Sequence, residues 1–278
     1  MEDIRIIGDS STDLADEARA ELGVGEIIPF YLNIAGEIIT DDKTLNVSVL
    51  LQKMKACTVK MTTACGSPHD WKEAFVKAGK GFAVTLSQKL SGSYAAACAG
   101  LKMAKEESGC EGHVFDSMSA VSGETLLVYK IREFIDKGFS MDEIIEKTES
   151  FIKSMKTIFV LDDVSNLVKN GRMSRIKGTL VNVLGIKPLL HGKDGEIELL
   201  GKVRGEKKIA EKMVDMIASS GREINGDDLV VSHCNNLLLA QEVIAKAKVR
   251  FNFGKIRIVE MKGLSTFYAC DKGIVMSF

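Results

Sequence analysis

The stretch Phe82-Ala-Val-Thr-Leu86 is followed by Ser87-Gln-Lys-Leu-Ser-Gly-Ser93 and then by an Ala-rich segment from Tyr94 to Glu107. The first part is a short apolar run, which predicts a buried strand, and the Ser-rich part predicts a loop. Alanine is a strong helix former, so the third part predicts a helix. Strand, loop and helix in this order are typical of an α/β fold with parallel strands and right-handed crossovers.

The same unit occurs at the N-terminus. The apolar run from Ile4 to Gly8 predicts a strand, and the polar cluster Asp9-Ser-Ser-Thr-Asp13 predicts a strand-to-helix loop. We expect Thr12 or Asp13 to cap a helix that runs to about Leu22. The other elements expected in this half are a strand or hairpin at 26–40 with Gly36 at the turn, a helix at 47–54, a strand at 113–115, and helices at about 119–136 and 141–156.

The pattern changes near Thr157. Lys187 to Leu200, with Asp194-Gly195 in its centre, predicts a β-hairpin. Strands are expected at 158–161, 229–232, 255–261 and 274–278, and helices at 162–169, 206–219 and 237–251. We therefore predict two domains. Residues 1–157 form an α/β domain with a mostly parallel sheet and helices on both faces, and residues 158–278 form a mixed α/β domain.

Composition excludes several classes of protein. The 278 residues contain 37 Lys and Arg and 38 Asp and Glu, a net charge of −1, which argues against a nucleic-acid partner. The longest uncharged run, Leu229 to Gln241, is shorter than the roughly 20 apolar residues of a membrane span. The first residues show no export signal, and the six cysteines form no C-x-x-C pair. Both features predict a cytoplasmic protein with reduced thiols.

The sequence lacks the common catalytic motifs. It has no G-x-x-x-x-G-K-[ST], G-x-G-x-x-G, H-E-x-x-H or G-x-S-x-G. What it has instead are three hydroxyl-rich loops, at Asp9 to Asp13, Thr62 to Pro68 and Leu90 to Tyr94. In open α/β sheets ligands lie outside the carboxyl ends of the strands, and Ser91-Gly-Ser93 presents hydroxyls and backbone N–H groups to an anion. The alternative is that these Ser and Thr side chains only cap helices.

Three further groups of residues are candidate catalytic, metal-binding or partner-binding sites. Asp9 and Asp116 both follow strands, so they are candidate metal ligands or acid–base groups, or simply turn residues. The segment 169–208 holds ten basic and four acidic residues, and its Arg172 and Arg175 face either an acidic partner or solvent. The pair His233-Cys234 is typical of a nucleophile, but adjacent residues of a strand point to opposite faces.

Short motifs along nearly the whole chain resemble the DegV family of bacterial fatty-acid-binding proteins. Each motif is weak alone, but eight in register are specific. They are Asp9-Ser-Ser-Thr-Asp-Leu14, the loop Thr63 to Pro68, Leu90-Ser-Gly-Ser-Tyr94, Phe115-Asp-Ser117, Asn170-Gly-Arg-Met-Ser174, Ile186-Lys-Pro-Leu-Leu190, Asp194-Gly195 and Lys202-Val-Arg-Gly205.

The resemblance implies a two-domain α/β protein that holds one long-chain fatty acid between its domains. It implies that Thr63 and Ser91 hold the carboxylate and that Arg172 lies near the head group and the partner-facing surface. Gly92 and Ser93 belong to the same loop and join the predicted ligand-binding set. The family commonly ends in a Gly-Thr-His stretch whose His binds the head group. Here the segment is Gly263-Leu-Ser-Thr-Phe-Tyr268, and Tyr268, Thr266 or Ser265 would supply a hydroxyl instead.

The leading hypothesis is therefore a lipid carrier without catalysis of its own, without metal or cofactor, which presents a fatty acid to a fatty-acid kinase. One alternative is an enzyme that acts on a small phosphorylated or carboxylated metabolite, with the same loops as an anion cradle and Asp9 or Asp116 as acid–base groups or metal ligands. Another is a regulatory binding module whose basic stretch at Arg172 and Arg175 docks an acidic partner.

Overall fold

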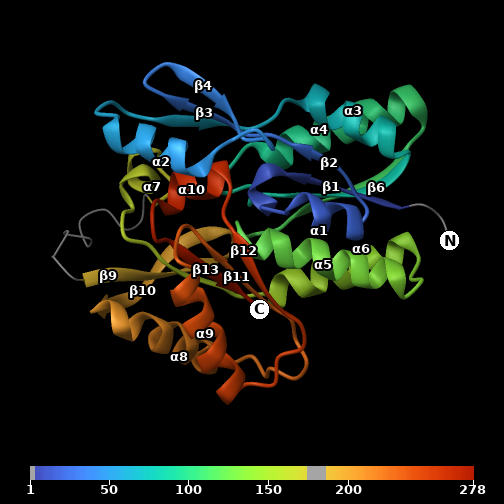
Figure 1. The fold of residues 1–278 in the computed structure, drawn as a ribbon. Coiled ribbons are helices and arrows are strands. Elements are labelled where there is room, and N and C mark those ends of the chain that lie inside the picture. The colour runs from blue at the N-terminus through green and yellow to red at the C-terminus, as the bar shows by residue number, and fades with distance from the viewer. Residues whose placement is uncertain (1–3, 174–185) are drawn as a thin grey trace.

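The computed structural model describes residues 4–173 and 186–278, and its first half is built around a parallel sheet (Figure 1). The elements of this half are β1 (Arg5–Asp9), η1 (Ser10–Thr12), α1 (Asp16–Glu21), β2 (Val24–Ile28), β3 (Tyr31–Ile34), β4 (Glu37–Thr40), α2 (Val47–Ala56), β5 (Thr62–Ala64), α3 (Pro68–Ala78), β6 (Lys80–Thr85), α4 (Ser93–Ser108), β7 (Glu111–Asp116), α5 (Ser122–Asp136) and α6 (Met141–Ser154).

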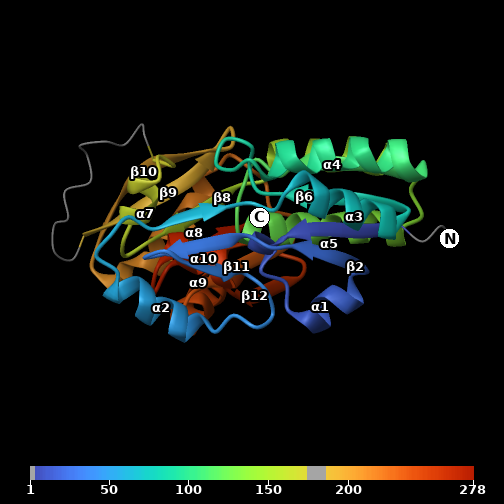
Figure 2. The ribbon, with the colours of Figure 1, turned by 90° about the horizontal axis from the view of Figure 1, so that it is seen from above.

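Helices cover both faces of this sheet, as the sequence predicts. The strand order is β2-β1-β6-β7 and every pairing is parallel. Side chains alternate between the faces: Ile6 and Phe82 pack with α5 and α6, whereas Ile7 and Ala83 pack with α3 and α4 (Figures 1 and 2). A smaller antiparallel sheet, β4-β3-β5, extends from the same half, with the predicted hairpin turn at Gly36.

The second half forms a mixed six-stranded sheet in the order β10-β9-β8-β13-β11-β12. Its elements are β8 (Thr157–Val160), α7 (Ser165–Lys169), β9 (Ile186–Lys193), β10 (Glu196–Arg204), η3 (Glu206–Lys208), α8 (Ile209–Ser219), β11 (Leu229–His233), α9 (Leu237–Arg250), β12 (Ile256–Glu260), α10 (Gly263–Ala269) and β13 (Ile274–Ser277). All of its strands follow residue 156.

One face of the six-stranded sheet is covered and the other looks toward the first half. Ile158 and Met276 pack under α8 and α9. Phe159 and Val275, one residue along their strands, point to the opposite face. Helix α5 lies between the halves and packs against β11 and β13. The inner face of this sheet therefore borders a space between the two halves.

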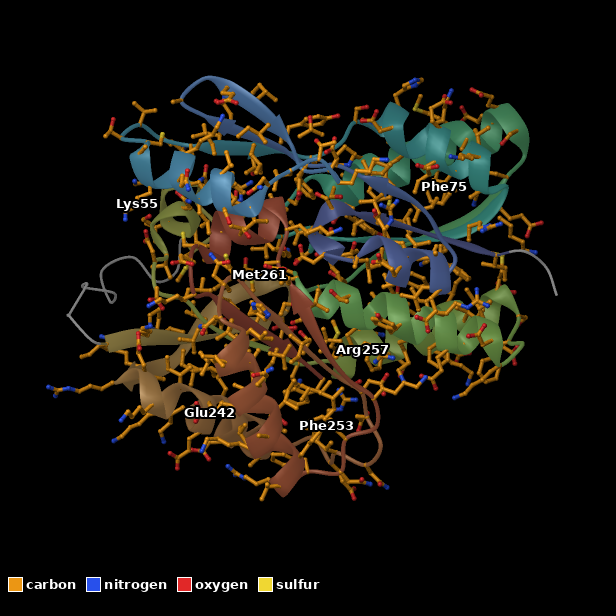
Figure 3. All side chains as sticks on the ribbon, viewed as in Figure 1. Lys55, Phe75, Glu242, Phe253, Arg257 and Met261 are labelled. Atoms are coloured by element: carbon orange, nitrogen blue, oxygen red, sulfur yellow. The ribbon has the colours of Figure 1, made fainter. Side chains whose placement is uncertain are left out.

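Helix α10 leaves the second half and packs against the first. It contacts α2, η1 and β3, and Figure 1 shows it beside α2. Met261, two residues before it, lies near the middle of the molecule (Figure 3). The chain then returns through Cys270 and Lys272, both with positive φ, to β13. Residues far apart in sequence thus meet at α10.

Two local expectations are corrected by the structure. Thr12 and Asp13 do not cap α1: this helix begins after Ala15 without a side-chain cap, and Asp9 caps the short η1 instead. Part of the predicted loop Thr62 to Pro68 is a strand, β5, and the end of the loop caps α3, where Ser67 and Asp70 form a capping box.

Among the described residues, no helix is both long and apolar enough to span a membrane. The six cysteines are free thiols.

Candidate functional site

A narrow cavity lies between the two halves of the molecule. The space between its walls, open mouth included, is about 760 Å³. The wall from the second half includes Phe159 and Val275, the wall from the first half includes Leu90, and α10 contributes Leu264.

Most of the cavity wall is apolar. The apolar lining side chains include Leu86, Leu90, Phe159, Leu161, Ile197 and Val275. The hydroxyls of Ser11, Ser119, Thr157 and Ser265 and the side chains of Arg172, Glu196 and Tyr268 provide the polar part. A wall of this kind suits a molecule with a long apolar body and a polar end, because each part then meets its own kind of surface.

Tyr268, which lines the cavity, is in contact with Thr63 through its hydroxyl. The two oxygens are 2.9 Å apart, although the residues lie on α10 and β5. Two hydroxyls that bond each other use one of their two protons. The second proton stays available for an acceptor, so the pair can donate to an anion that approaches it.

Arg172 lies beside this pair. Its guanidinium carbon is 6.0 Å from the centre of the Tyr268 ring. Nε donates to the carbonyl of Leu90 at 3.1 Å and Nη1 to the carbonyl of Asn170 at 2.6 Å. Both acceptors are neutral carbonyls, so these two bonds leave the positive charge of Arg172, which lines the cavity, without a neutralising partner among the described residues.

Ser91, Gly92 and Ser93 occupy the loop that precedes α4, and they differ in role. Ser91 Oγ accepts from Ser93 N at 3.1 Å, which leaves the hydroxyl proton of Ser91 for another acceptor. A Cβ built on Gly92 would lie 3.5 Å from the sulfur of Cys65, so this loop touches the segment after Thr63. Ser93 is buried, and its hydroxyl donates to Asp9 Oδ2 at 2.6 Å.

The structure therefore brings together four of the six predicted ligand-binding residues. Thr63, Ser91, Arg172 and Tyr268, called here the head-group cluster, come from four separate segments of the chain. Of the six, Arg172 and Tyr268 line the cavity itself, whereas Thr63 contacts Tyr268 and Ser91 follows Leu90, whose carbonyl accepts from Arg172. The hydroxyl of Ser93 serves the protein interior. The ligand-binding role of each residue stays a prediction.

The other candidate catalytic and metal-binding residues do not form a site with the head-group cluster among the described residues. Asp116 Oδ1 accepts from the backbone N–H groups of Gln88 and Met118 at 3.1 and 3.0 Å, which is the turn role foreseen as its alternative. Burial raises the pKa of the Cys234 thiol to about 11, so little nucleophilic thiolate is present at neutral pH. Arg175 lies outside the described residues. Within 4–173 and 186–278, no group of three or more His, Cys, Asp or Glu side chains is arranged to hold a metal ion.

Buried carboxyl groups hold α10 over the cavity. Asp41 accepts from the backbone N–H groups of Gly263 and Leu264, both at 2.8 Å, and from the hydroxyl of Ser10 at 2.7 Å. Asp13 Oδ1 accepts from the N–H of Lys262 at 2.8 Å. These bonds satisfy the first N–H groups of α10 from the first half of the chain. Through them the N-terminal half positions the helix that carries Tyr268.

Sequence reasoning missed part of this arrangement. It identified Asp9-Ser-Ser-Thr-Asp13 as a polar loop, but nothing in the sequence paired it with Asp41 or with Glu124, a fully buried acid within α5. Glu124 sits in a helix where an acidic residue usually faces solvent. A signal for its burial is the run of apolar and small neighbours from Leu126 to Val128, all of which are buried.

The fold is α/β, the cavity is narrow and mostly apolar, and hydroxyl groups and a guanidinium lie at or beside its wall. These features are typical of the class of proteins that bind small amphipathic molecules. The family model described as "Uncharacterised protein, DegV family" matches residues 3–276. A DegV domain-containing protein of Streptococcus gordonii is 34% identical over 99% of this chain and 98% of its own. The chain belongs to the DegV family.

Solved structures of similar proteins agree with this assignment. A DegV family protein from Ruminococcus gnavus, refined with vaccenic acid, has a TM-score of 0.94 and 35% identity, and the match covers 100% of both chains. The Fatty Acid Kinase (Fak) B3 protein of Streptococcus pneumoniae, loaded with linoleic acid, has a TM-score of 0.90 and 32% identity over 99% of this chain and 98% of its own. The predicted family and the predicted two-part α/β fold are both confirmed.

Proposed function

We propose that this protein binds one long-chain fatty acid in the cavity between its two halves, with the carboxylate at the head-group cluster. The observation that carries the proposal is that Arg172 and Tyr268 lie side by side at the wall of a mostly apolar cavity, with Thr63 bonded to the Tyr268 hydroxyl. A buried carboxylate needs several donors, because an unpaired buried charge costs several kcal/mol. Two spare hydroxyl protons and one cation meet that need.

The energetics of the apolar part support binding. About 15 methylenes buried at ~0.8 kcal/mol each contribute roughly 12 kcal/mol. Lost translational freedom and chain ordering offset on the order of half of this. What is left, about 6 kcal/mol, corresponds to a Kd on the order of tens of micromolar, and the contribution of the head group adds to it.

The protein acts, in this proposal, as a carrier that supplies no nucleophile and presents the fatty acid to a fatty-acid kinase. Two observations support this: a similar protein of Streptococcus pneumoniae is described as a Fatty Acid Kinase (Fak) B3 protein, and Cys234, the nucleophile considered from the sequence, has a raised thiol pKa. The division into domains at 1–157 and 158–278 belongs to the same proposal, since the cavity lies between them.

Native mass spectrometry of the purified protein tests the proposal. We expect one acyl species per chain, or its acquisition after palmitate is added. Absence of any acyl species in both experiments would overturn it. A complex that forms with a phosphorylated metabolite instead, and turns it over, would favour the enzyme considered above.

A further inference from the structure

The hydroxyl of Ser11 has two carboxyl groups as neighbours and one proton to give. Ser11 Oγ is 3.1 Å from Asp9 Oδ1 and is also in hydrogen-bond contact with Glu124 Oε1. A hydroxyl can donate to only one of them. The other contact needs a proton on a carboxyl oxygen, because two oxygens without a proton between them repel. At least one of the two acids is therefore protonated.

The surrounding donors decide which acid holds this proton. Asp9 accepts from the backbone N–H groups of Ser11 and Leu86, at 3.2 and 2.9 Å, and from the hydroxyl of Ser93. Such a set of donors stabilises a carboxylate. Glu124 Oε2 has no hydrogen-bond partner, and Glu124 is fully buried. The proton therefore belongs on Glu124, which donates to Ser11, and Ser11 donates to Asp9.

The charges around the pair agree with this assignment. Burial raises the pKa of Glu124 well above its ordinary value, and the negative charge of Asp9 raises it further. Burial also raises the pKa of Asp9, but hydrogen bonds from Ser93, Glu124, Leu86 and Ser11 oppose this rise. Asp13 adds a further negative charge near Glu124, and the ammonium of Lys262 donates to the carbonyl of Leu14.

Asp9 also joins the two ends of a loop. Leu86 and Ser93, both bonded to Asp9 Oδ2, are the first and last residues of the segment 86–93. Between them lie Leu90, whose carbonyl accepts from Arg172, and Ser91 of the head-group cluster. A displacement of Asp9 would therefore move Ser91 relative to the rest of that cluster.

We propose that Asp9 is the positioning residue of the loop that carries Ser91, and that Glu124 holds Asp9 in place as a neutral carboxylic acid through Ser11. The part that concerns Ser91 rests on the proposed function, whereas the protonation of Glu124 does not. Neither residue touches the ligand in this arrangement. They act through the hydrogen bonds that shape segment 86–93.

Infrared spectroscopy of the ligand-free protein at neutral pH tests the protonation. We expect the Glu124→Gln variant to lose one component of the carboxylic-acid carbonyl band. Glu242→Gln, on the outer face of α9 (Figure 3), is the matched control and should leave the band unchanged, since its side chain is about half exposed. A Glu124→Gln spectrum that superimposes on that of the unmodified protein would overturn the assignment.

The positioning role is tested by comparing palmitate with hexadecanol, which has the same chain but no carboxylate. In Asp9→Asn the amide offers one acceptor oxygen in place of two, so we expect the palmitate-to-hexadecanol affinity ratio to fall at least about tenfold. General damage to the fold would weaken both ligands alike. A folded variant whose ratio stays within about twofold of the original would contradict the role.

Substitution of Ser93 provides the same test if Asp9→Asn does not fold. Ser93→Ala removes one donor to Asp9, and we expect a lower affinity ratio. Ser93→Thr keeps the hydroxyl and should restore it. An unchanged ratio in Ser93→Ala overturns the positioning role. If the unmodified protein binds neither probe, the proposed function fails and the loop role with it, while the infrared result still decides the state of Glu124.

Discussion

Two polar clusters lie near the same cavity: the head-group cluster and the carboxyl cluster, which consists of Asp9 and Asp41. They differ in whether their hydrogen-bonding groups already have partners within the protein. In the head-group cluster, and among the described residues, the Thr63–Tyr268 pair keeps one hydroxyl proton and Ser91 keeps another, and the bonds of Arg172 go to neutral carbonyls. In the carboxyl cluster Asp9 and Asp41 are surrounded by donors from the protein itself. The head-group cluster can therefore donate hydrogen bonds to an anionic ligand, whereas the carboxylates of the carboxyl cluster hold loops and helices in place.

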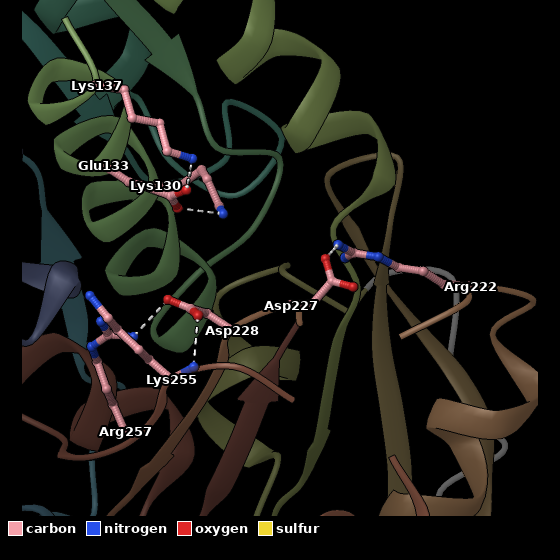
Figure 4. A network of polar contacts seen from close by, with 8 residues as sticks. All are labelled: Lys130, Glu133, Lys137, Arg222, Asp227, Asp228, Lys255 and Arg257. Carbon is pink, nitrogen blue, oxygen red and sulfur yellow. Dashed lines mark hydrogen bonds and ion pairs between the residues drawn. The ribbon is translucent and has the colours of Figure 1, made fainter. Parts of the chain in front are cut away.

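The two glutamates of helix α5 also differ in their surroundings, and their pKa values shift in opposite directions. Glu133 lies toward the surface, where burial opposes ionisation but hydrogen bonds from Lys130 and Lys137 prevail and lower its pKa (Figure 4). Glu124, nine residues earlier, is fully buried next to Asp9, and its pKa is raised. One residue type on one helix is thus expected in opposite protonation states, because a cation reaches only one of them.

The largest expected effect comes from filling the cavity. Ile197→Trp adds bulk at the cavity wall on β10, and we expect fatty-acid affinity to fall by about 100-fold or more because the acyl chain loses its space. Isothermal titration calorimetry with palmitate measures this. Leu238→Trp, at a position 81% exposed on α9, is the control and should bind normally. Full binding by Ile197→Trp would place the ligand elsewhere.

Removal of two hydroxyls of the head-group cluster should have the next largest effect on fatty-acid affinity. In the double variant Thr63→Ala and Ser91→Ala the bound carboxylate loses two donors. Unsatisfied buried groups of this kind cost about 1–3 kcal/mol, so affinity should fall tenfold or more. Competition with a fluorescent fatty acid gives the affinity. An unchanged value would show that the carboxylate lies away from the head-group cluster.

The pH dependence of stability separates Glu124 from the exposed acids. Between the unfolded pKa, about 4.3, and the raised pKa of the folded state, folding takes up a proton at Glu124. Its contribution to stability therefore falls as pH rises, by up to about 1.4 kcal/mol per pH unit. The stability of Glu124→Gln relative to the original should rise over the same range. Urea unfolding at several pH values measures this difference, and a difference independent of pH would refute the prediction.

The smallest effect is expected at Tyr268. Tyr268→Phe removes the hydroxyl that bonds Thr63 but keeps the ring, which packs 4.9 Å from the ring of Phe267 between centroids. Thr63 and Arg172 continue to donate, so affinity for palmitate should fall only about fivefold. Affinity for hexadecanol serves as the internal comparison. Equal losses for both ligands would mean that the Tyr268 hydroxyl shapes the cavity and does not serve the head group.

Much of the fold was predictable because its signals are local. The strand before Asp9, the hairpin at Asp194-Gly195 and the helix after Ser93 each follow from a run of neighbouring residues. What the sequence did not indicate are the distant partners of polar residues. Asp13 bonds Lys262 instead of capping α1, and Ser93 bonds Asp9. A hydroxyl or carboxylate in a loop has many possible partners, and the sequence does not rank them.

The sequence alone determined the class of fold, the order of its elements and the family, since apolar periodicity, turn residues and short motifs act over a few positions. The resemblance also named a set of six residues, which are Thr63, Ser91, Gly92, Ser93, Arg172 and Tyr268. Only the tertiary structure decided that Arg172 and Tyr268 line one cavity with Thr63 bonded to Tyr268, that α10 crosses to the first half, and that Glu124 lies beside Asp9. The reason is physical: the charge state and the free hydrogen-bonding capacity of a side chain depend on every group that surrounds it, and those groups come from all parts of the chain.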